Sequence, residues 1–122
     1  MSAEKVSLDA AFARIDEHWR PKVVAELNGQ EVKLVKVKGE FVWHHHEAED
    51  ELFLIHKGTL RIEFRDRVVT LGPGECLVVP RGVEHRPVAE EEVEMILFEP
   101  GGVRNTGNVT DEKLTAPQGV KL

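Results

Sequence analysis

A stretch near the middle of the chain, residues 39–58, narrows the possible folds and functions more than any other part of it. It contains the pattern His-x-His-x4-Glu-x6-Gly, whose first three named positions are His44, His46 and Glu51. Side chains alternate between the two faces of a β-strand, so His44 and His46 point the same way while His45 points to the opposite face. Two imidazoles side by side, with a carboxylate returned by the next turn, are typical of a divalent metal site.

A second stretch, residues 74–85, supplies a third imidazole. Its pattern is Gly-x5-Pro-x-Gly-x2-His, and His85 follows a turn signal that contains Pro80 and Gly82. The candidate metal ligands are therefore His44, His46, Glu51 and His85. Neutral imidazoles and a carboxylate suit zinc, iron, manganese, nickel or copper, so we expect one divalent transition metal (Zn, Fe, Mn, Ni or Cu).

Together the two stretches resemble the paired motifs of the cupin superfamily. Two positions depart from them: four residues rather than five separate Gly39 from His44, and Ala89 stands where the second motif ends in Asn. The resemblance extends over about residues 39–100 and implies a small single-domain cupin of the cupin-2 type. The implied fold is all-β, a single cupin barrel of the double-stranded β-helix or jelly-roll kind. One such fold hosts many chemistries, so the resemblance leaves the activity open.

Length and charge exclude several classes of protein. A chain of 122 residues with 41% hydrophobic and 31% charged residues is typical of one globular domain. The net charge is −6 and no Lys/Arg cluster is present, which argues against nucleic acid and lipid surfaces as partners. No apolar run approaches the roughly 18 residues of a membrane span, and the start lacks an apolar signal region. The single Cys76 fits a reducing compartment, so we expect a cytoplasmic protein.

The first 21 residues are predicted to form a helix and a lead-in. Ser7 is a suitable N-cap, and Leu8, Ala11, Phe12, Ile15 and Trp19 follow at helical spacing on one side. The sequence therefore predicts a helix from Leu8 to Trp19, which Pro21 ends. We expect its apolar stripe to pack on the barrel.

Residues 22–100 are predicted to form the barrel, because the hydrophobic period changes to two. Asn28-Gly29 predicts a two-residue hairpin turn that pairs Leu27 with Gln30, Ala25 with Val32 and Val23 with Leu34. Further strands are expected at about 41–46, 52–57, 59–65, 68–71, 76–79, 85–88 and 93–99. Residues 90–92, all Glu, are interpreted as a solvated hairpin tip. Residues 101–122 are expected to form a tail that packs on the barrel or on a partner subunit.

Alternation also predicts the surroundings of the metal. If Glu51 points into the barrel, Phe53 and Ile55 do so as well, and with Val42 they would form a largely apolar pocket lining. Such a pocket favours a small ligand with one chelating polar end. The same alternation turns Phe41, Trp43, Leu52 and Leu54 outward. A large apolar outer face requires cover from the helix, a second subunit or both, so we expect a homodimer.

The sequence does not identify a catalytic residue. Glu47 and Glu49 are near enough in the chain to be considered as a general base, whereas His18 and His56 are interpreted as structural or solvated and Cys76 as a core residue. We favour a metal-dependent enzyme of the isomerase, dioxygenase or lyase type that acts on a small polar metabolite. The alternative is a non-catalytic cupin that only binds a small molecule.

Overall fold

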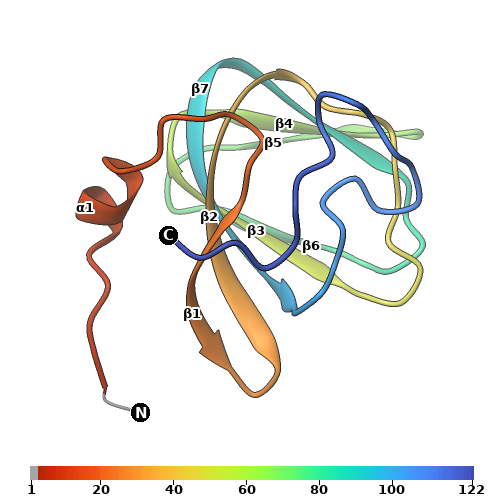
Figure 1. The fold of residues 1–122 in the computed structure, drawn as a ribbon. Coiled ribbons are helices and arrows are strands. Elements are labelled where there is room, and N and C mark those ends of the chain that lie inside the picture. The colour runs from red at the N-terminus through yellow and green to blue at the C-terminus, as the bar shows by residue number, and fades with distance from the viewer. Residues whose placement is uncertain (1–2) are drawn as a thin grey trace.

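The regular secondary structure consists almost entirely of antiparallel strands, as the sequence predicts. The structure is a computed structural model that describes residues 3–122. Its elements are one short helix and seven strands (Figure 1): α1 Leu8–Phe12, β1 Lys22–Leu27, β2 Gln30–Glu40, β3 Glu51–Lys57, β4 Leu60–Phe64, β5 Val68–Leu71, β6 Cys76–Val79 and β7 His85–Pro100. Within residues 3–122, no helix is long and apolar enough to cross a membrane.

Strand β7 organises the barrel. One edge of β7 pairs with β2 from Gln30↔Pro100 to Glu40↔Val88. The other edge pairs first with β4 and then with β3, while β6 continues the sheet beyond β3 and β5 beyond β4. Figure 1 shows β7 curving around the barrel between these partners. The prediction of two strands joined by a hairpin tip at residues 90–92 is wrong, because β7 is continuous there and the three glutamates are exposed in its middle.

The hairpin between β1 and β2 follows the predicted register only near its turn. Leu27 pairs with Gln30 and Ala25 with Val32, as the turn chemistry requires, and Asn28 and Gly29 both have a positive φ. The predicted pair Val23 with Leu34 is wrong. A bulge between Val23 and Ala25 inserts one extra residue, so Val23 pairs with Lys33 instead.

Helix α1 is shorter than the predicted helix from Leu8 to Trp19. It begins as expected, with the Ser7 hydroxyl accepting a hydrogen bond from the backbone of Ala10, but it ends at Phe12. Trp19 instead has a φ of 62°, donates its backbone N–H to Lys36 and stacks on Phe41 with ring centroids 4.6 Å apart. Pairing with β2 and burial of the indole in the barrel outweigh the helical preference of this segment.

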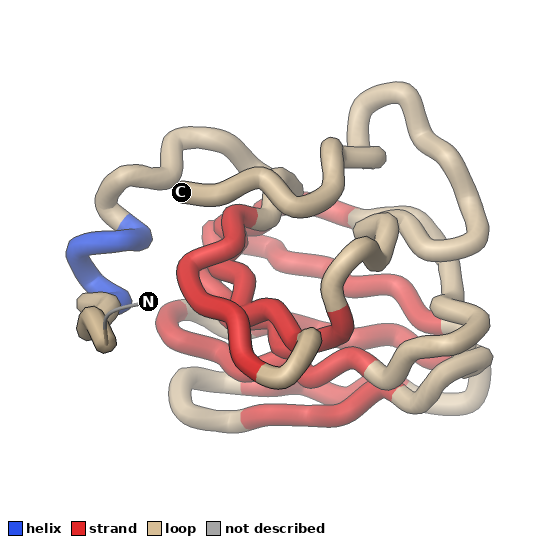
Figure 2. Tube along the Cα trace, turned by 60° about the horizontal axis from the view of Figure 1, so that its bottom comes forward, coloured by secondary structure: helices blue, strands red, loops and turns tan. Residues whose placement is uncertain are grey.

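The apolar side chains form two cores. The larger core fills the barrel and includes Val35, Phe53 and Leu97. The smaller core lies outside the barrel, where Phe12 of α1 covers Leu34, Ile96 and the half-buried Leu54. Figure 2 shows α1 lying beside the strands rather than over the end of the barrel. The helix therefore covers part of the apolar outer face that the alternation predicts.

One residue of that predicted face lies differently. Phe41 is buried in the barrel core, so its outward placement is wrong. The reason is that residues 41–46 form no strand apart from a single bridge at His44, so strict alternation does not apply to Phe41. Trp43 is half-buried beneath the guanidinium of Arg65, which lies 3.8 Å from its ring centroid.

Cys76, expected in the core, is exposed because it pairs with the outward-facing Leu54.

The C-terminal tail, residues 101–122, packs on its own barrel. Near its end Val23 donates its backbone N–H to Val120, and Leu122 donates to Val23. Closer to the strands, Asn105 donates its side-chain N–H to the carbonyl of Leu114, while its Oδ1 accepts from Ala116. These bonds hold the tail against the barrel and across the lead-in that follows α1.

Candidate metal centre

The four candidate ligands come from three places in the chain. His44 and His46 lie in the segment between β2 and β3, Glu51 begins β3, and His85 begins β7. His44 and His85 exchange two backbone hydrogen bonds of 3.0 and 2.9 Å, and Gly82 donates to the carbonyl of His46 over 2.8 Å. The segment that carries the first two imidazoles is therefore fixed against the turn that leads to the third. His44 and His46 still point the same way although the segment is not a regular strand.

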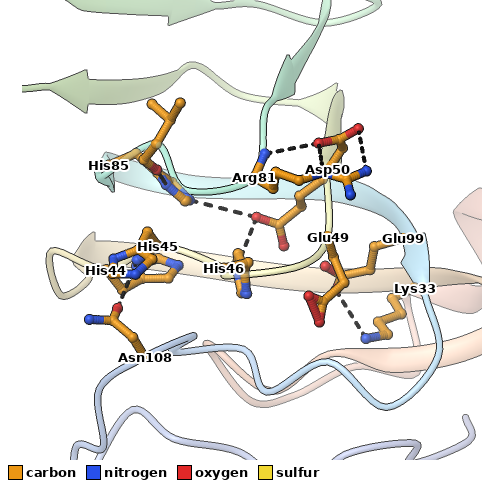
Figure 3. Close-up of polar contacts among 12 residues, drawn as sticks. Lys33, His44, His45, His46, Glu49, Asp50, Arg81, His85, Glu99 and Asn108 are labelled. Carbon is orange, nitrogen blue, oxygen red and sulfur yellow. Dashed lines mark hydrogen bonds and ion pairs between the residues drawn. The ribbon is translucent and has the colours of Figure 1, made fainter.

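The structure brings all four side chains into one buried cluster (Figure 3). Each offers one ligand atom, and these atoms all lie within 4.8 Å of one another. Oε1 of Glu51 lies 3.5 Å from Nε2 of His46 and 3.6 Å from Nε2 of His85. The residues are between 0% and 5% exposed, so water contributes little to the solvation of these polar groups.

Two backbone carbonyls orient the imidazoles. Nδ1 of His44 lies 2.9 Å from the carbonyl oxygen of Val42, and Nδ1 of His85 lies 3.0 Å from that of Val83. A carbonyl only accepts, so each Nδ1 carries the proton and each Nε2 keeps a free lone pair. Nε2 of His46, Nε2 of His85 and Oε1 of Glu51 are buried without a hydrogen-bond partner among the described residues. Three such atoms aimed at one point fit a bound cation.

The electrostatics of the cluster agree with this donor set. Burial, reinforced by the neighbouring His85 ring, lowers the pKa of His44 to about 4. Burial alone would raise the pKa of Glu51, but the nearby rings of His46 and His85 outweigh it, and the pKa falls below its ordinary value. At neutral pH His44 is therefore neutral and Glu51 ionised, which are the protonation states that a metal requires of its ligands.

Two further buried charged residues lie behind Glu51, and the sequence analysis missed both. Nζ of Lys33 lies 3.0 Å from Oε1 of Glu99 and 3.6 Å from Oε1 of Glu31. Glu99 also contacts Glu51, and burial together with that carboxylate raises the pKa of Glu99 well above its ordinary value, against the opposing charge of Lys33. Alternation along the strand could have identified Glu99 as buried, because Glu99 shares the inward face with Val93, Met95 and Leu97.

A small cavity adjoins the cluster. It has a volume of about 30 Å³, room for one or two water molecules, and it is bounded by His44, Glu51 and mainly apolar side chains. Of the three predicted lining residues, Phe53 lines it. Ile55 is buried in the barrel core and the half-buried Val42 packs against that core, and neither is among the described residues that line the cavity.

The other sequence candidates lie away from the cavity. The ring of His45 pairs with the exposed Glu47, and the backbone N–H of His45 bonds to Oδ1 of Asn108 over 2.8 Å (Figure 3). The Glu49 carboxylate accepts a hydrogen bond from the backbone of Ala48. The remaining two histidines form hydrogen bonds on the outer surface, His18 with Glu92 and His56 with Asp9.

Comparison with known proteins defines the class. A family model described as the cupin domain matches residues 30–100. Together with the fold and the four clustered side chains, this match shows that the chain belongs to the cupin family. The resemblance inferred from the two sequence motifs is thereby confirmed.

Several relatives share this fold. A cupin-2 domain-containing protein from Shewanella frigidimarina NCIMB 400 is 48% identical, with 78% of this chain and 93% of that chain covered and a TM-score of 0.77. Protein NMB1881 from Neisseria meningitidis is 33% identical, with 80% and 99% covered and a TM-score of 0.74. The uncharacterised protein YdbB of Bacillus subtilis (strain 168) is 39% identical over 64 residues, which span 52% of this chain and 57% of YdbB. These names give the class of the chain but no activity.

Proposed function

We propose that this cupin binds one divalent transition metal through His44, His46, Glu51 and His85. The observation that carries the proposal is the convergence of three buried, unpartnered ligand atoms from His46, Glu51 and His85 among the described residues. A polar atom buried without a partner costs about 1–3 kcal/mol, so three of them at one point need a compensating ligand. A cation is the partner that two imidazole lone pairs and a carboxylate share.

Charge around the cluster supports a divalent ion. Glu31 and Glu99 flank the ammonium of Lys33, Glu51 lies beside Glu99 on the neighbouring strand, and all four side chains are largely removed from water. When all are ionised, these groups carry a net charge of −2, which a divalent cation neutralises. Buried uncompensated charge is costly, and in the absence of a metal the raised pKa of Glu99 relieves part of it.

The cavity indicates what such a metal is for. A metal held by this cluster supplies Lewis acidity, which polarises a bound carbonyl or carboxylate or acidifies a bound water. His44 and Glu51 border the cavity, while Phe41, Phe53 and Met95 give it apolar walls. A small ligand with one chelating polar end fits this lining. The chain's own residues would hold the metal with His44 and Glu51 beside the ligand and would exclude most of the water from it.

The function that follows is a metal-dependent enzyme of the isomerase, dioxygenase or lyase type, acting on a small polar metabolite. A non-catalytic small-molecule-binding cupin is the second candidate, and it is favoured by the small volume of the cavity, about 30 Å³. A cytoplasmic location belongs to the same proposal and is supported by the single, exposed Cys76.

Cobalt-substituted protein tests whether the metal accepts a further ligand. We expect azide or a small carboxylate to change the visible absorption of the cobalt, and we expect the metal-free protein to stay folded by circular dichroism, because the barrel has its own hydrophobic core. Turnover of a candidate metabolite would then separate the enzyme from the binding protein. An absorption spectrum that ignores every added ligand, together with unfolding of the metal-free protein, would show a structural metal and contradict the proposal.

A further inference from the structure

We propose that Glu99, held in place by Lys33, is a positioning residue for Glu51 and fixes the orientation of this carboxylate toward the metal. The inference rests on the metal site proposed above and extends it to two residues that belong to neither cupin motif.

The register of the sheet places the two glutamates side by side. Strands β3 and β7 are antiparallel neighbours, and Leu52 pairs with Phe98. One residue further along the same pair of strands, Glu51 stands opposite Glu99. Residues directly opposite each other in an antiparallel pair have Cβ atoms about 4.5–5.5 Å apart, and two carboxyl groups there repel when both are charged. Both side chains are also buried, with Glu51 4% and Glu99 2% exposed, so water does not screen them.

Lys33 fixes the far side of Glu99. On the other edge of β7, Glu99 pairs with Glu31 of β2, two residues from Lys33, and Nζ of Lys33 approaches Oε1 of Glu99 to 3.0 Å. Lys33 is itself only 5% exposed, which leaves its long side chain little freedom. Figure 3 shows Lys33 and Glu99 together on one side of the cluster, with His85 on the other.

The contact between Glu99 and Glu51 passes this restraint to the metal site. Oε1 of Glu51 faces His46 and His85, and Glu99 lies beside the same carboxylate on the neighbouring strand. A carboxylate held from behind cannot rotate freely, so its metal-facing oxygen stays aimed at the imidazoles. Glu99 is not among the described residues that line the cavity. Its effect therefore reaches the metal through Glu51, and Glu99 is a positioning residue rather than a catalytic one.

Three variants separate this role from a merely structural one. Glu99→Gln keeps an acceptor for Lys33 and a polar side chain of the same size beside Glu51, so it should retain the wild-type cobalt affinity and absorption spectrum. Glu99→Leu removes both contacts and should weaken cobalt binding about 10–100-fold, the usual effect of losing such an outer partner, and change the spectrum. The double variant Lys33→Met/Glu99→Leu replaces a buried ion pair by apolar residues of similar size. Such replacements are often tolerated, so it keeps the test available if Glu99→Leu does not fold.

Glu94→Leu is a matched control. Glu94 lies on the same strand and has a buried Oε1, but it faces His56, 4.0 Å away, and not the metal cluster. We expect this substitution to leave cobalt affinity unchanged whatever it does to the stability of the metal-free protein.

The results expected for these variants distinguish failure of the positioning role from failure of the metal site. Wild-type affinity and spectrum in the folded Glu99→Leu or double variant would overturn the positioning role and leave the metal site intact. Equal losses in Glu99→Gln and Glu99→Leu would also overturn it, because glutamine keeps the acceptor for Lys33 and the size of the side chain beside Glu51. Failure of the unsubstituted protein to bind cobalt at all would overturn the metal site and this inference with it.

Discussion

Gly107 of the C-terminal tail lies so close to the backbone of His45 that a methyl group on Gly107 would overlap the carbonyl oxygen of His45. The contact is continued by Asn108, whose backbone N–H bonds to the same carbonyl over 3.0 Å and whose Oδ1 accepts from the N–H of His45 over 2.8 Å. His45 separates the two imidazoles of the first motif. The tail therefore fixes the segment that carries His44 and His46.

Replacing Gly107 by Ala is expected to lower the free energy of unfolding by about 2–5 kcal/mol. Gly107 has a φ of +57°, which costs an L-residue about 1–2 kcal/mol, and the overlap with His45 adds about 1–3 kcal/mol of overpacking. Urea unfolding in the presence of a chelator measures the change. Gly119→Ala is the matched control, because Gly119 has a similar φ of +67° but no described atom within 4 Å of the new methyl group. Equal losses in both variants would show that contact with His45 is unimportant.

The metal content of the protein should depend on the clustered histidines and not on the neighbouring His45. We expect about one equivalent of metal per chain by elemental analysis of untagged protein. His46→Ala or His85→Ala should remove most of it, because each deletes a buried nitrogen aimed at the cluster. His45→Ala should retain it, since the His45 ring pairs with Glu47 on the outside. A comparable loss in all three variants would contradict the assignment of ligands.

The contribution of His44 to the stability of the metal-free protein should fall as the pH falls from about 6.5 to about 4. The folded protein holds the pKa of His44 at about 4, whereas the unfolded chain takes up this proton at about 6.5. In this window the unfolded state binds the extra proton at His44, so acid weakens the contribution of this residue by on the order of 3 kcal/mol over the whole range. Above pH 6.5 this contribution is constant.

Chemical denaturation at pH 7 and pH 5 in a chelating buffer measures this dependence. Glu99 acts in the opposite direction over this range, because its pKa is raised in the folded protein while the unfolded chain releases its proton. The contribution of His44 is therefore measured as the difference between the unsubstituted protein and a variant that lacks only His44. The variant His44→Gln has no proton to take up at this position, and its loss of stability between pH 7 and pH 5 should be smaller. An unchanged pH dependence in this variant would mean that His44 titrates normally in the folded protein.

A homodimer is still predicted, although fewer apolar residues on the outer face require cover than the sequence indicated. Phe41 is buried in the barrel, and α1 covers Leu54, so two of the four residues offered as an exposed apolar face need no partner subunit. Light scattering should give twice the chain mass of 13.7 kDa if the dimer forms. A mass of one chain across micromolar concentrations would exclude it.

Local sequence was sufficient for much of the fold. Hydrophobic alternation placed β3, β5 and β6 within a residue of their observed bounds, because each strand buries one face in the barrel. Asn28-Gly29 fixed the hairpin turn, since both residues adopt a positive φ readily. The spacing of His44 and His46 with Glu51 and His85 also identified four side chains that the structure brings together. Such information is local, because turn chemistry and the period of a strand act over a few residues.

Other features depend on segments that are far apart in the sequence. Trp19 is not helical as predicted, because its indole is buried in the barrel and stacks on Phe41. No local sequence pattern predicts this contact. Lys33 and Glu99 are separated by 66 positions and meet because β2 and β7 are neighbours in the sheet. Asn108 of the tail bonds to His45 across a sequence separation of 63 positions. The sequence by itself determined which side chains could bind a metal; the tertiary structure decided what lies behind Glu51 and what holds His45, because these contacts depend on strand order and register.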